Sequence, residues 1–175
     1  MLPIVLHSLA VQTFSDFEVI VTDNGSSQRT NRKIIDNIDS RFRHVDTQSL
    51  ECGECYSSAN WAVANECQGE FVCFPSDDSY YVPVFAEQML KSADYNSWDL
   101  VYCNMVYDAR FTGQYYAAID VYPTLNSIDK TGFILRRSKF QPFNITEKAD
   151  GELIELLVSQ GISHGKIPDV LMVHN

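Results

Sequence analysis

The chain has 175 residues, of which 45% are hydrophobic and 12% aromatic, and its formal net charge is −10 at pH 7. This length and composition predict one globular domain that folds without disulfides, and they exclude a disordered chain. The acidic balance opposes binding to nucleic acid, and no apolar run approaches the roughly 20 residues of a spanning helix, so we expect no transmembrane segment.

The first half of the chain alternates between helices and short strands. The apolar spacing of residues 2–9 predicts an amphipathic helix, and no basic segment or cleavage site marks a signal peptide there. Residues 17–22 predict a buried strand that the turn-forming residues 23–27 close. A polar helix is expected over residues 29–38. Another helix, capped by Ser57 or Ser58, is expected to run to about Cys67.

The alternation continues to residue 107 and then loosens. Residues 71–74 predict a second buried strand, Pro83 can start another helix, and residues 99–107 form a further strand. Residues 111–126 are aromatic and irregular. Later segments predict a strand at 131–137, a helix at 149–160 and a returning strand at 167–173. Alternation of this kind favours an α/β fold with a mostly parallel sheet flanked by helices.

The five cysteines are an odd number in apolar surroundings, which indicates reduced thiols and a cytoplasmic protein. Cys52 and Cys55 have the spacing of half a zinc site or of a redox pair. Because the sequence offers no second pair and no nearby histidine, structural thiols are the preferred interpretation.

Two acidic turns follow predicted strands. Asp77 and Asp78 come directly after the strand at 71–74, and Asp23 follows the strand at 17–22. Adjacent carboxylates repel each other unless a cation neutralises them, and Mg²⁺ or Mn²⁺ favours carboxylate and phosphate oxygens. Because ligands bind at the carboxyl ends of parallel strands, the two turns are expected to meet at one crevice. The alternative is a solvated turn in which Asp78 caps the next helix.

The order of these segments resembles the nucleotide-binding half of family 2 glycosyltransferases. The matching segments are 12–14 (QTF), 17–26 (FEVIVTDNGS), 58–60 (SAN), 69–71 (GEF), 74–78 (FPSDD), 128–137 (IDKTGFILRR), 149–152 (ADGE) and 173–175 (VHN). Several motifs in a fixed order are far more specific than any one of them, and together they extend over nearly the whole chain.

The resemblance implies a GT-A fold and a role for five residues. Asp23 would bind the nucleobase of a nucleotide-diphospho-sugar donor, and Asp77 would face its ribose or sugar. Asp78 would ligate Mn²⁺ or Mg²⁺, with His174 as a second ligand; the alternative for His174 is a polar residue at a chain end. Asp150 would be the catalytic base of an inverting transfer, and the alternative is stabilisation of a helix N-terminus by its charge.

Three features depart from the pattern of the family. The family begins with an additional strand, and this chain starts after it, so we expect an N-terminal truncation or a misplaced start codon. Ala149 stands where an acidic neighbour of the base is usual, so the base role rests on one carboxylate. Ala59 stands where a basic residue often precedes Asn60, which leaves part of the donor contacts unassigned.

We therefore expect a single catalytic domain over residues 1–175, in which 1–95 bind the nucleotide-sugar and metal and 96–175 form the acceptor side. The acceptor would be a glycan or a lipid-linked molecule. The expected location is the cytoplasm, including a peripheral position at the inner membrane face. The alternatives are an inactive or truncated nucleotide-sugar-binding module of a larger glycan synthase, and a nucleotidyltransferase, whose glycine-rich basic loop the chain lacks.

Overall fold

The computed structural model of the chain describes residues 2–24, 32, 35, 37–47, 55–108, 113, 115–144 and 146–175. The helices are α1 (Leu2–Ala10), α3 (Cys55–Asn65), α4 (Phe85–Asn96) and α5 (Ala149–Ser159), with the short 3-10 helices η3 (Lys130–Gly132) and η4 (Arg137–Lys139). None of the helices in the described ranges has the length and apolarity that crossing a membrane requires.

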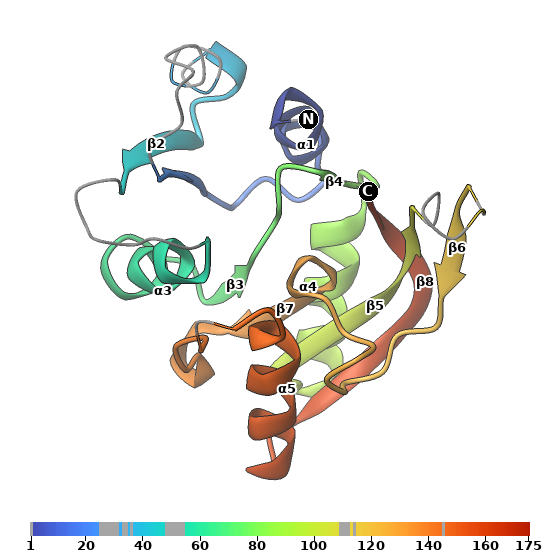
Figure 1. Cartoon of the computed structure of the whole chain (residues 1–175). Helices are drawn as coiled ribbons and strands as arrows, with labels where there is room; N and C mark the ends of the chain where they lie inside the picture. The colour runs from blue at the N-terminus through green and yellow to red at the C-terminus, as the bar shows by residue number, and fades with distance from the viewer. Residues whose placement is uncertain are drawn as a thin grey trace.

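The strands form two sheets (Figure 1). They are β1 (Val19–Asp23), β2 (Phe42–Asp46), β3 (Phe71–Cys73), β4 (Ser79–Tyr81), β5 (Leu100–Tyr107), β6 (Ala117–Ile119), β7 (Phe133–Arg136) and β8 (His164–His174). β1 and β2 pair in parallel as a small sheet of two strands. The other strands form a six-stranded sheet in the order β3-β7-β5-β8-β4, and β6 pairs with β5.

The prediction of a mostly parallel sheet is wrong. Among the described strands of the six-stranded sheet, β5 and β8 are the parallel pair, and β3–β7, β7–β5, β8–β4 and β5–β6 are all antiparallel. A parallel pair needs a long crossover connection, usually a helix, whereas antiparallel strands do not. β4 follows β3 after only a short turn, and β7 follows the irregular segment after β6. These connections let the chain reverse direction, so the sheet is mixed.

The core lies around β5, the central strand of the larger sheet. Its first four residues are all buried, between β7 on one side and β8 on the other. The neighbouring strands contribute Phe133 and Met172, which are both 0% exposed, and α5 contributes Ile154 with the same value. Burial on both sides explains why this strand is almost continuously apolar. Figure 1 shows α4 and α5 packed beside these strands.

Most of the predicted elements are present, with shifted bounds. Ser57 and Ser58 lie inside α3 rather than at its N-cap. The strand expected at residues 131–137 starts with η3 and becomes β7 at Phe133. The segment expected to be irregular contains the short strand β6. Residues 25–27 and most of the helix expected at 29–38 lie outside the described residues, as does Cys52.

The thiols of the described cysteines are unreactive in character. Cys67, Cys73 and Cys103 are free, and burial raises the pKa of Cys73 and of Cys103 to about 12. The thiolate is the nucleophilic and metal-binding form of cysteine, so these two side chains behave as small hydrophobic groups.

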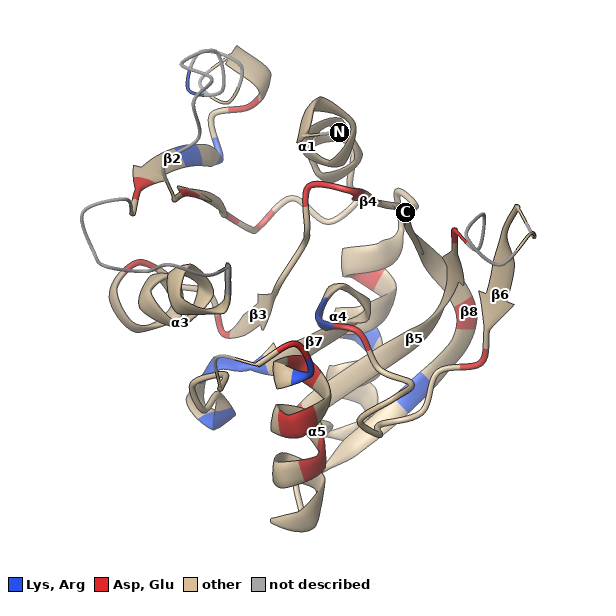
Figure 2. Cartoon of the chain, in the orientation of Figure 1, with Lys and Arg blue, Asp and Glu red and all other residues tan. Residues whose placement is uncertain are grey.

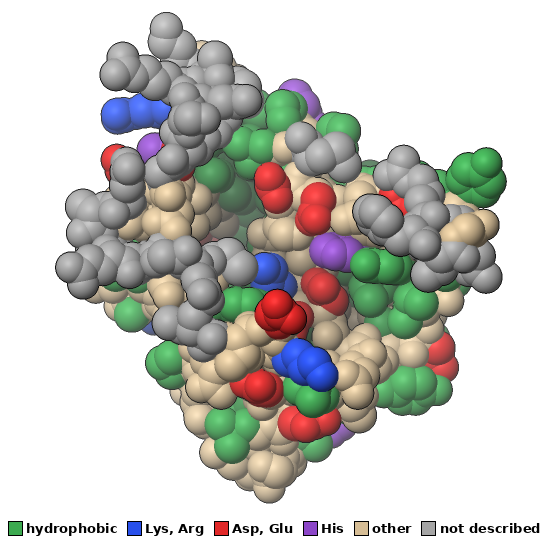
Figure 3. Space-filling model, in the orientation of Figure 1, with side chains coloured by type: hydrophobic (Ala, Val, Ile, Leu, Met, Phe, Trp, Pro, Cys, Tyr) green, Lys and Arg blue, Asp and Glu red, His purple; other side chains and the backbone are tan. Residues whose placement is uncertain are grey.

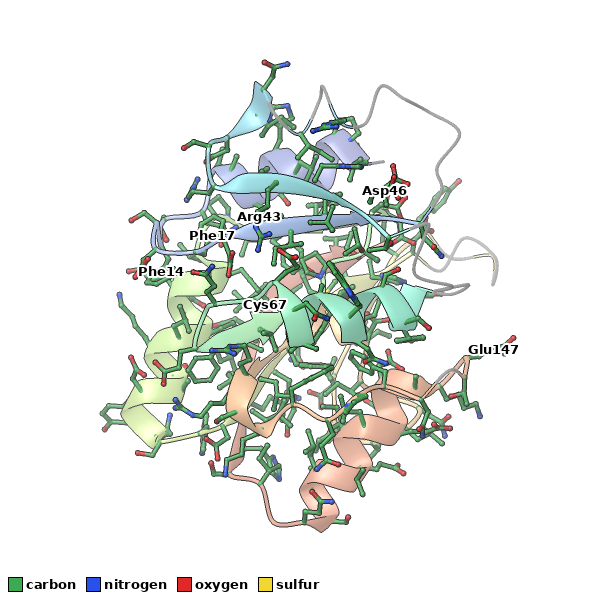
Figure 4. The ribbon with its side chains drawn as sticks, turned by 90° about the vertical axis from the view of Figure 1, so that its left-hand side faces the viewer. Phe14, Phe17, Arg43, Asp46, Cys67 and Glu147 are labelled. Atoms are coloured by element: carbon green, nitrogen blue, oxygen red, sulfur yellow. The ribbon has the colours of Figure 1, made fainter. Side chains whose placement is uncertain are left out.

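Arg43 of β2 ties the smaller sheet to the end of α3. One guanidinium nitrogen donates to the backbone oxygen of Glu66 at 2.8 Å and to the carboxylate of Glu18 at 3.4 Å, and the other pairs with the Glu66 carboxylate. Figure 4 shows Arg43 on the α3 side of β2 and near Cys67, with Asp46 at the opposite end of the strand. The smaller sheet is therefore joined to the rest of the chain by polar contacts as well as by packing.

Gln12 joins three elements through one buried side chain. Its amide nitrogen donates to the backbone oxygens of Ser8 in α1 and Val82 after β4, at 2.9 and 2.8 Å. Its side-chain oxygen accepts from the N–H of Ala86 in α4 at 3.0 Å. The residue is 8% exposed, so water cannot replace these bonds. Gln12 thus fixes α1 and α4 on the strand that follows the acidic turn.

We expect Gln12→Ala to lower the free energy of unfolding by about 1–3 kcal/mol, because it leaves buried backbone groups without partners. Gln68→Ala is the matched control, since Gln68 is exposed. Urea unfolding of both variants measures the difference. Equal stability of the two variants would show that the hydrogen bonds of Gln12 add nothing to folding.

Candidate active site

The acidic turn between β3 and β4 is held by two serines. The hydroxyl of Ser76 donates to Oδ1 of Asp78 and lies 3.2 Å from the hydroxyl of Ser79, the first residue of β4. Asp77 is exposed, and the side chain of Asp78 is 41% exposed. Asp78 does not cap the next helix, because the N-cap of α4 is Val84. Figure 2 shows this acidic segment directly before β4.

His174 reaches the same turn from the far end of the sequence. It is the last residue of β8 and stands opposite Ser79 in the antiparallel β4–β8 pair. Its Nδ1 lies 3.0 Å from the Ser79 hydroxyl and 3.8 Å from Oδ1 of Asp78. The ring stacks on Tyr107 with 5.4 Å between centroids, which fixes its orientation. Asn175 donates twice to the backbone oxygen of Asp78, from its backbone N–H and its side chain.

The Asp78–His174 pair fits a divalent cation. Two ligand atoms on one Mg²⁺ or Mn²⁺ lie at most about 4.2 Å apart, twice the metal–ligand distance of about 2.1 Å. The observed 3.8 Å between Oδ1 and Nδ1 is within that limit. Within the described ranges no three His, Cys, Asp or Glu side chains cluster as a complete metal cage. Such a pair suits a metal whose other ligands are water and substrate phosphates, as is usual for Mg²⁺.

Asp150 lies in the first turn of α5 and is partly buried. Its Oδ2 accepts from the N–H of Lys130 at 3.0 Å, and its Oδ1 accepts from the N–H of Gly151 at 2.8 Å. Burial raises the pKa of Asp150, and the negative charge of Asp129 raises it further against the opposing effect of these hydrogen bonds. A carboxylate with a raised pKa is a stronger base than an ordinary aspartate.

The start of α5 is closely packed. A Cβ on Gly151 would lie 2.6 Å from the backbone of Leu125, so only glycine allows this close approach. Ala149 is 0% exposed. An acidic side chain at position 149 would bring a charge into the core, which gives a physical reason for the alanine that departs from the expected pattern.

Asp23 belongs to the smaller sheet and has a partner that the sequence did not suggest. Its Oδ2 lies 3.2 Å from Nε2 of His44 on β2, and both side chains are largely buried, with exposures of 19% and 13%. The backbone oxygen of Asp23 accepts from the N–H and the hydroxyl of Thr47 at 2.8 and 3.1 Å. The end of β1 is therefore held by the residue that follows β2.

The structure thus brings together Asp78 and His174, while Asp23 and Asp150 have partners of their own. Figure 3 shows acidic side chains and a histidine gathered in the middle of one face. Sequence reasoning missed His44, Ser79 and the N–H of Lys130. His44 stands between Arg43 and Val45, so its surroundings in the sequence gave little sign that it would face Asp23. A backbone N–H leaves no signal in the sequence at all.

Comparison with known proteins identifies the family. The sequence model described as glycosyl transferase family 2 matches residues 1–151. The chain belongs to glycosyl transferase family 2. The resemblance found in the sequence motifs is therefore confirmed, and the family match covers Asp23, Asp77, Asp78 and Asp150.

Individual proteins and solved structures also resemble the chain. The chain is 29% identical over 111 residues to the glycosyltransferase EpsH of Bacillus subtilis (strain 168), a match that covers 62% of this chain and 31% of EpsH. It superposes on the crystal structure of S. aureus TarS 1-349 with a TM-score of 0.79 and 20% identity, over 99% of this chain and 56% of TarS 1-349.

A second TarS structure contains a nucleotide-sugar. TarS 1-349 in complex with UDP-GlcNAc matches with a TM-score of 0.75 and 20% identity, over 97% of this chain and 53% of that chain. The shared fold supports the expected GT-A architecture, with the mixed sheet described above. The present chain spans about a third of the length of EpsH and about half of the length of TarS 1-349.

Proposed function

We propose that the chain is the donor-binding and catalytic part of a glycosyltransferase, which moves a sugar from a nucleotide diphosphate to a hydroxyl group of a glycan or lipid-linked acceptor. Membership of glycosyl transferase family 2 supports the reaction class. The observation that carries the proposal is the Asp78–His174 pair, with 3.8 Å between Oδ1 and Nδ1. A pair of this kind suits a divalent cation that the oxygens of a diphosphate complete.

The donor would be held by four side chains in this proposal. Asp23 would accept a hydrogen bond from the nucleobase, and the exposed Asp77 would contact the ribose or the sugar. Asp78 and His174 would hold Mn²⁺ or Mg²⁺. The bound cation would stabilise the negative charge that develops on the departing diphosphate.

Asp150 would be the catalytic base. Its carboxylate takes the proton of the acceptor hydroxyl as the hydroxyl oxygen forms a bond to the anomeric carbon. The bond from this carbon to the diphosphate oxygen breaks on the opposite side, and the diphosphate leaves with the electron pair. The configuration at the anomeric carbon inverts. The raised pKa of Asp150 supports this role, because the ideal pKa of a base lies near the working pH.

A uridine diphosphate sugar is the first donor to test. TarS 1-349, whose fold the chain shares, has been solved with UDP and with UDP-GlcNAc. A carboxylate only accepts hydrogen bonds, so Asp23 suits a base that presents an N–H, as uracil does. This reasoning favours uridine over cytidine, whose ring nitrogen at the same edge is an acceptor.

Calorimetric titration of the purified chain with the diphosphates of uridine, guanosine, thymidine and cytidine tests the proposal, each with and without Mn²⁺. We expect uridine diphosphate to bind and its affinity to rise with Mn²⁺. Equal affinity with and without Mn²⁺ would remove the metal from the proposal. If none of the four nucleotides binds, the chain has no donor site of the proposed kind.

A donor-binding module without transfer is the second candidate. Its support is the buried Ala149, which stands where an acidic neighbour of the base is usual, so that the base role rests on Asp150 alone. We propose that residues 1–175 form one domain. Residues 1–95 carry Asp23, Asp77 and Asp78 of the donor and metal sites, and residues 96–175 form the acceptor side and add His174 to the metal site. Donor binding without any turnover would favour the module, whereas release of the nucleotide diphosphate would favour the enzyme.

A further inference from the structure

A short turn packs against the acidic start of α5. Asp129 is the N-cap of η3, and its Oδ1 accepts from the N–H and the hydroxyl of Thr131 at 2.8 and 2.5 Å. Thr131 is 0% exposed, so this turn is anchored in the core. The preceding N–H, that of Lys130, donates to Oδ2 of Asp150 at 3.0 Å. The turn that Asp129 caps therefore sets the position of the Lys130 N–H, which donates to Asp150.

The charge of Asp129 also acts on Asp150. The carboxylate of Asp129 raises the pKa of Asp150, in the same direction as the larger effect of burial. Lys130 is the cation on the same turn, and its ammonium group lies 4.8 Å from the ring centroid of Tyr56 on α3.

Two further carboxylates on α5, those of Glu152 and Glu155, have partners elsewhere. Glu152 accepts from the side chain of Asn144 at 3.0 Å. Glu155 accepts from the N–H of Leu125 at 2.8 Å. The charge of Asp129, by contrast, acts on Asp150 from the turn whose Lys130 N–H bonds to it.

We propose that Asp129 is a positioning residue for Asp150, which it serves in two ways. It caps the turn whose Lys130 N–H holds the Asp150 carboxylate, and it places a second negative charge beside that carboxylate. The inference rests on the proposed function in so far as Asp150 is the base of the transfer. Each oxygen of Asp150 accepts one backbone N–H and keeps a second lone pair for a substrate proton.

The two contributions have opposite effects on Asp150. A negative neighbour disfavours the ionised carboxylate and makes it a stronger base, whereas a hydrogen bond to the carboxylate favours ionisation. Asparagine caps a helix about as well as aspartate, so Asp129→Asn removes the charge and keeps the cap. Asp129→Ala removes both. The two variants therefore separate the charge from the cap.

Carbon-13 NMR titration of the full chain labelled at aspartate carboxyl groups tests the proposal, with the Asp150 signal assigned by its loss in Asp150→Asn. We expect Asp129→Asn to move the Asp150 midpoint to lower pH. Asp129→Ala should leave it at a higher pH than Asp129→Asn does, because the Lys130 N–H is no longer held. Asp120→Asn, which removes an exposed charge paired with Lys166, should leave the midpoint unchanged.

An Asp150 midpoint that stays in place in Asp129→Asn would overturn the role of the charge, and equal midpoints in the two Asp129 variants would overturn the role of the cap. Transfer or hydrolysis of UDP-GlcNAc with Mn²⁺, measured against pH, provides the functional readout. In Asp129→Asn the acidic limb should move to lower pH while the plateau rate falls, whereas loss of structure would lower the rate at every pH. Absence of turnover in all proteins would refute the proposed function, and the NMR titration would still decide the role of Asp129.

Discussion

Asp150→Asn is expected to lower the rate of sugar transfer by about 10²–10⁴-fold, the usual contribution of a general base. Donor binding should be unchanged, because the donor is proposed to contact Asp23, Asp77, Asp78 and His174 instead. The measurement is nucleotide diphosphate release in the presence of acceptor, together with calorimetric binding of the donor. Asp94→Asn is the matched control, since Asp94 is exposed on α4 and should keep full activity.

The pH dependence of the unchanged protein gives a second check on Asp150. Burial raises its pKa above the usual aspartate value of 3.8, so the acidic limb of the rate profile should lie above that pH. The same shift affects stability. The folded protein holds the proton of Asp150 more tightly than the unfolded chain does. The contribution of this proton to stability is therefore complete below the pKa of Asp150 in the unfolded chain, and it is lost as the pH rises through the pKa of Asp150 in the folded protein.

If sugar transfer survives in Asp150→Asn, another group must act as the base.

The sequence predicted most elements of the fold, because apolar periodicity reports which face of a segment is buried. α1, β1, β3, α4, β5, β7, α5 and β8 all have counterparts among the predicted segments. Periodicity does not report the direction of a strand. The direction of β7 therefore could not be predicted, since it depends on long-range pairing with β5. The short strand β4 was not predicted at all, and it exists through its pairing with β8.

The candidate site depended even more on long-range pairing. A lone histidine near a chain end gives little signal from its own surroundings, and only the resemblance to the family suggested His174. In the structure the β4–β8 register sets Ser79 opposite His174, residues 95 apart in sequence. The contact that follows, between His174 and Asp78, is a result of sheet register rather than of local sequence.

The environment of Asp150 could not be predicted for a different reason. Its neighbours include the backbone N–H of Lys130, a group that every residue except proline carries. Its second neighbour, Asp129, was part of the matching segment at residues 128–137, but no pattern indicated that this segment would pack against α5. Similarly, His44 faces Asp23 because the parallel β1–β2 pair sets their two strands side by side.

Asp78→Asn is expected to abolish the part of donor binding that depends on metal. An amide lacks the charge that a hard divalent cation requires, and His174 alone would be left as a ligand. The fold should be kept, because the Asp78 side chain is 41% exposed and contributes no packing to the core. The measurement is the affinity for uridine diphosphate with and without Mn²⁺, with thermal unfolding as the check on folding.

Asp169→Asn is the matched control for this variant, since Asp169 is an exposed carboxylate on β8, the strand that carries His174. If the metal acts through Asp78, the Mn²⁺-dependent gain in affinity disappears in Asp78→Asn and persists in Asp169→Asn. His174→Ala should reduce the same gain, because it removes the other half of the pair. An unchanged gain in Asp78→Asn would mean that any cation is held by other groups, and the separation of Asp78 and His174 would then reflect the hydrogen bonds through Ser76 and Ser79 alone.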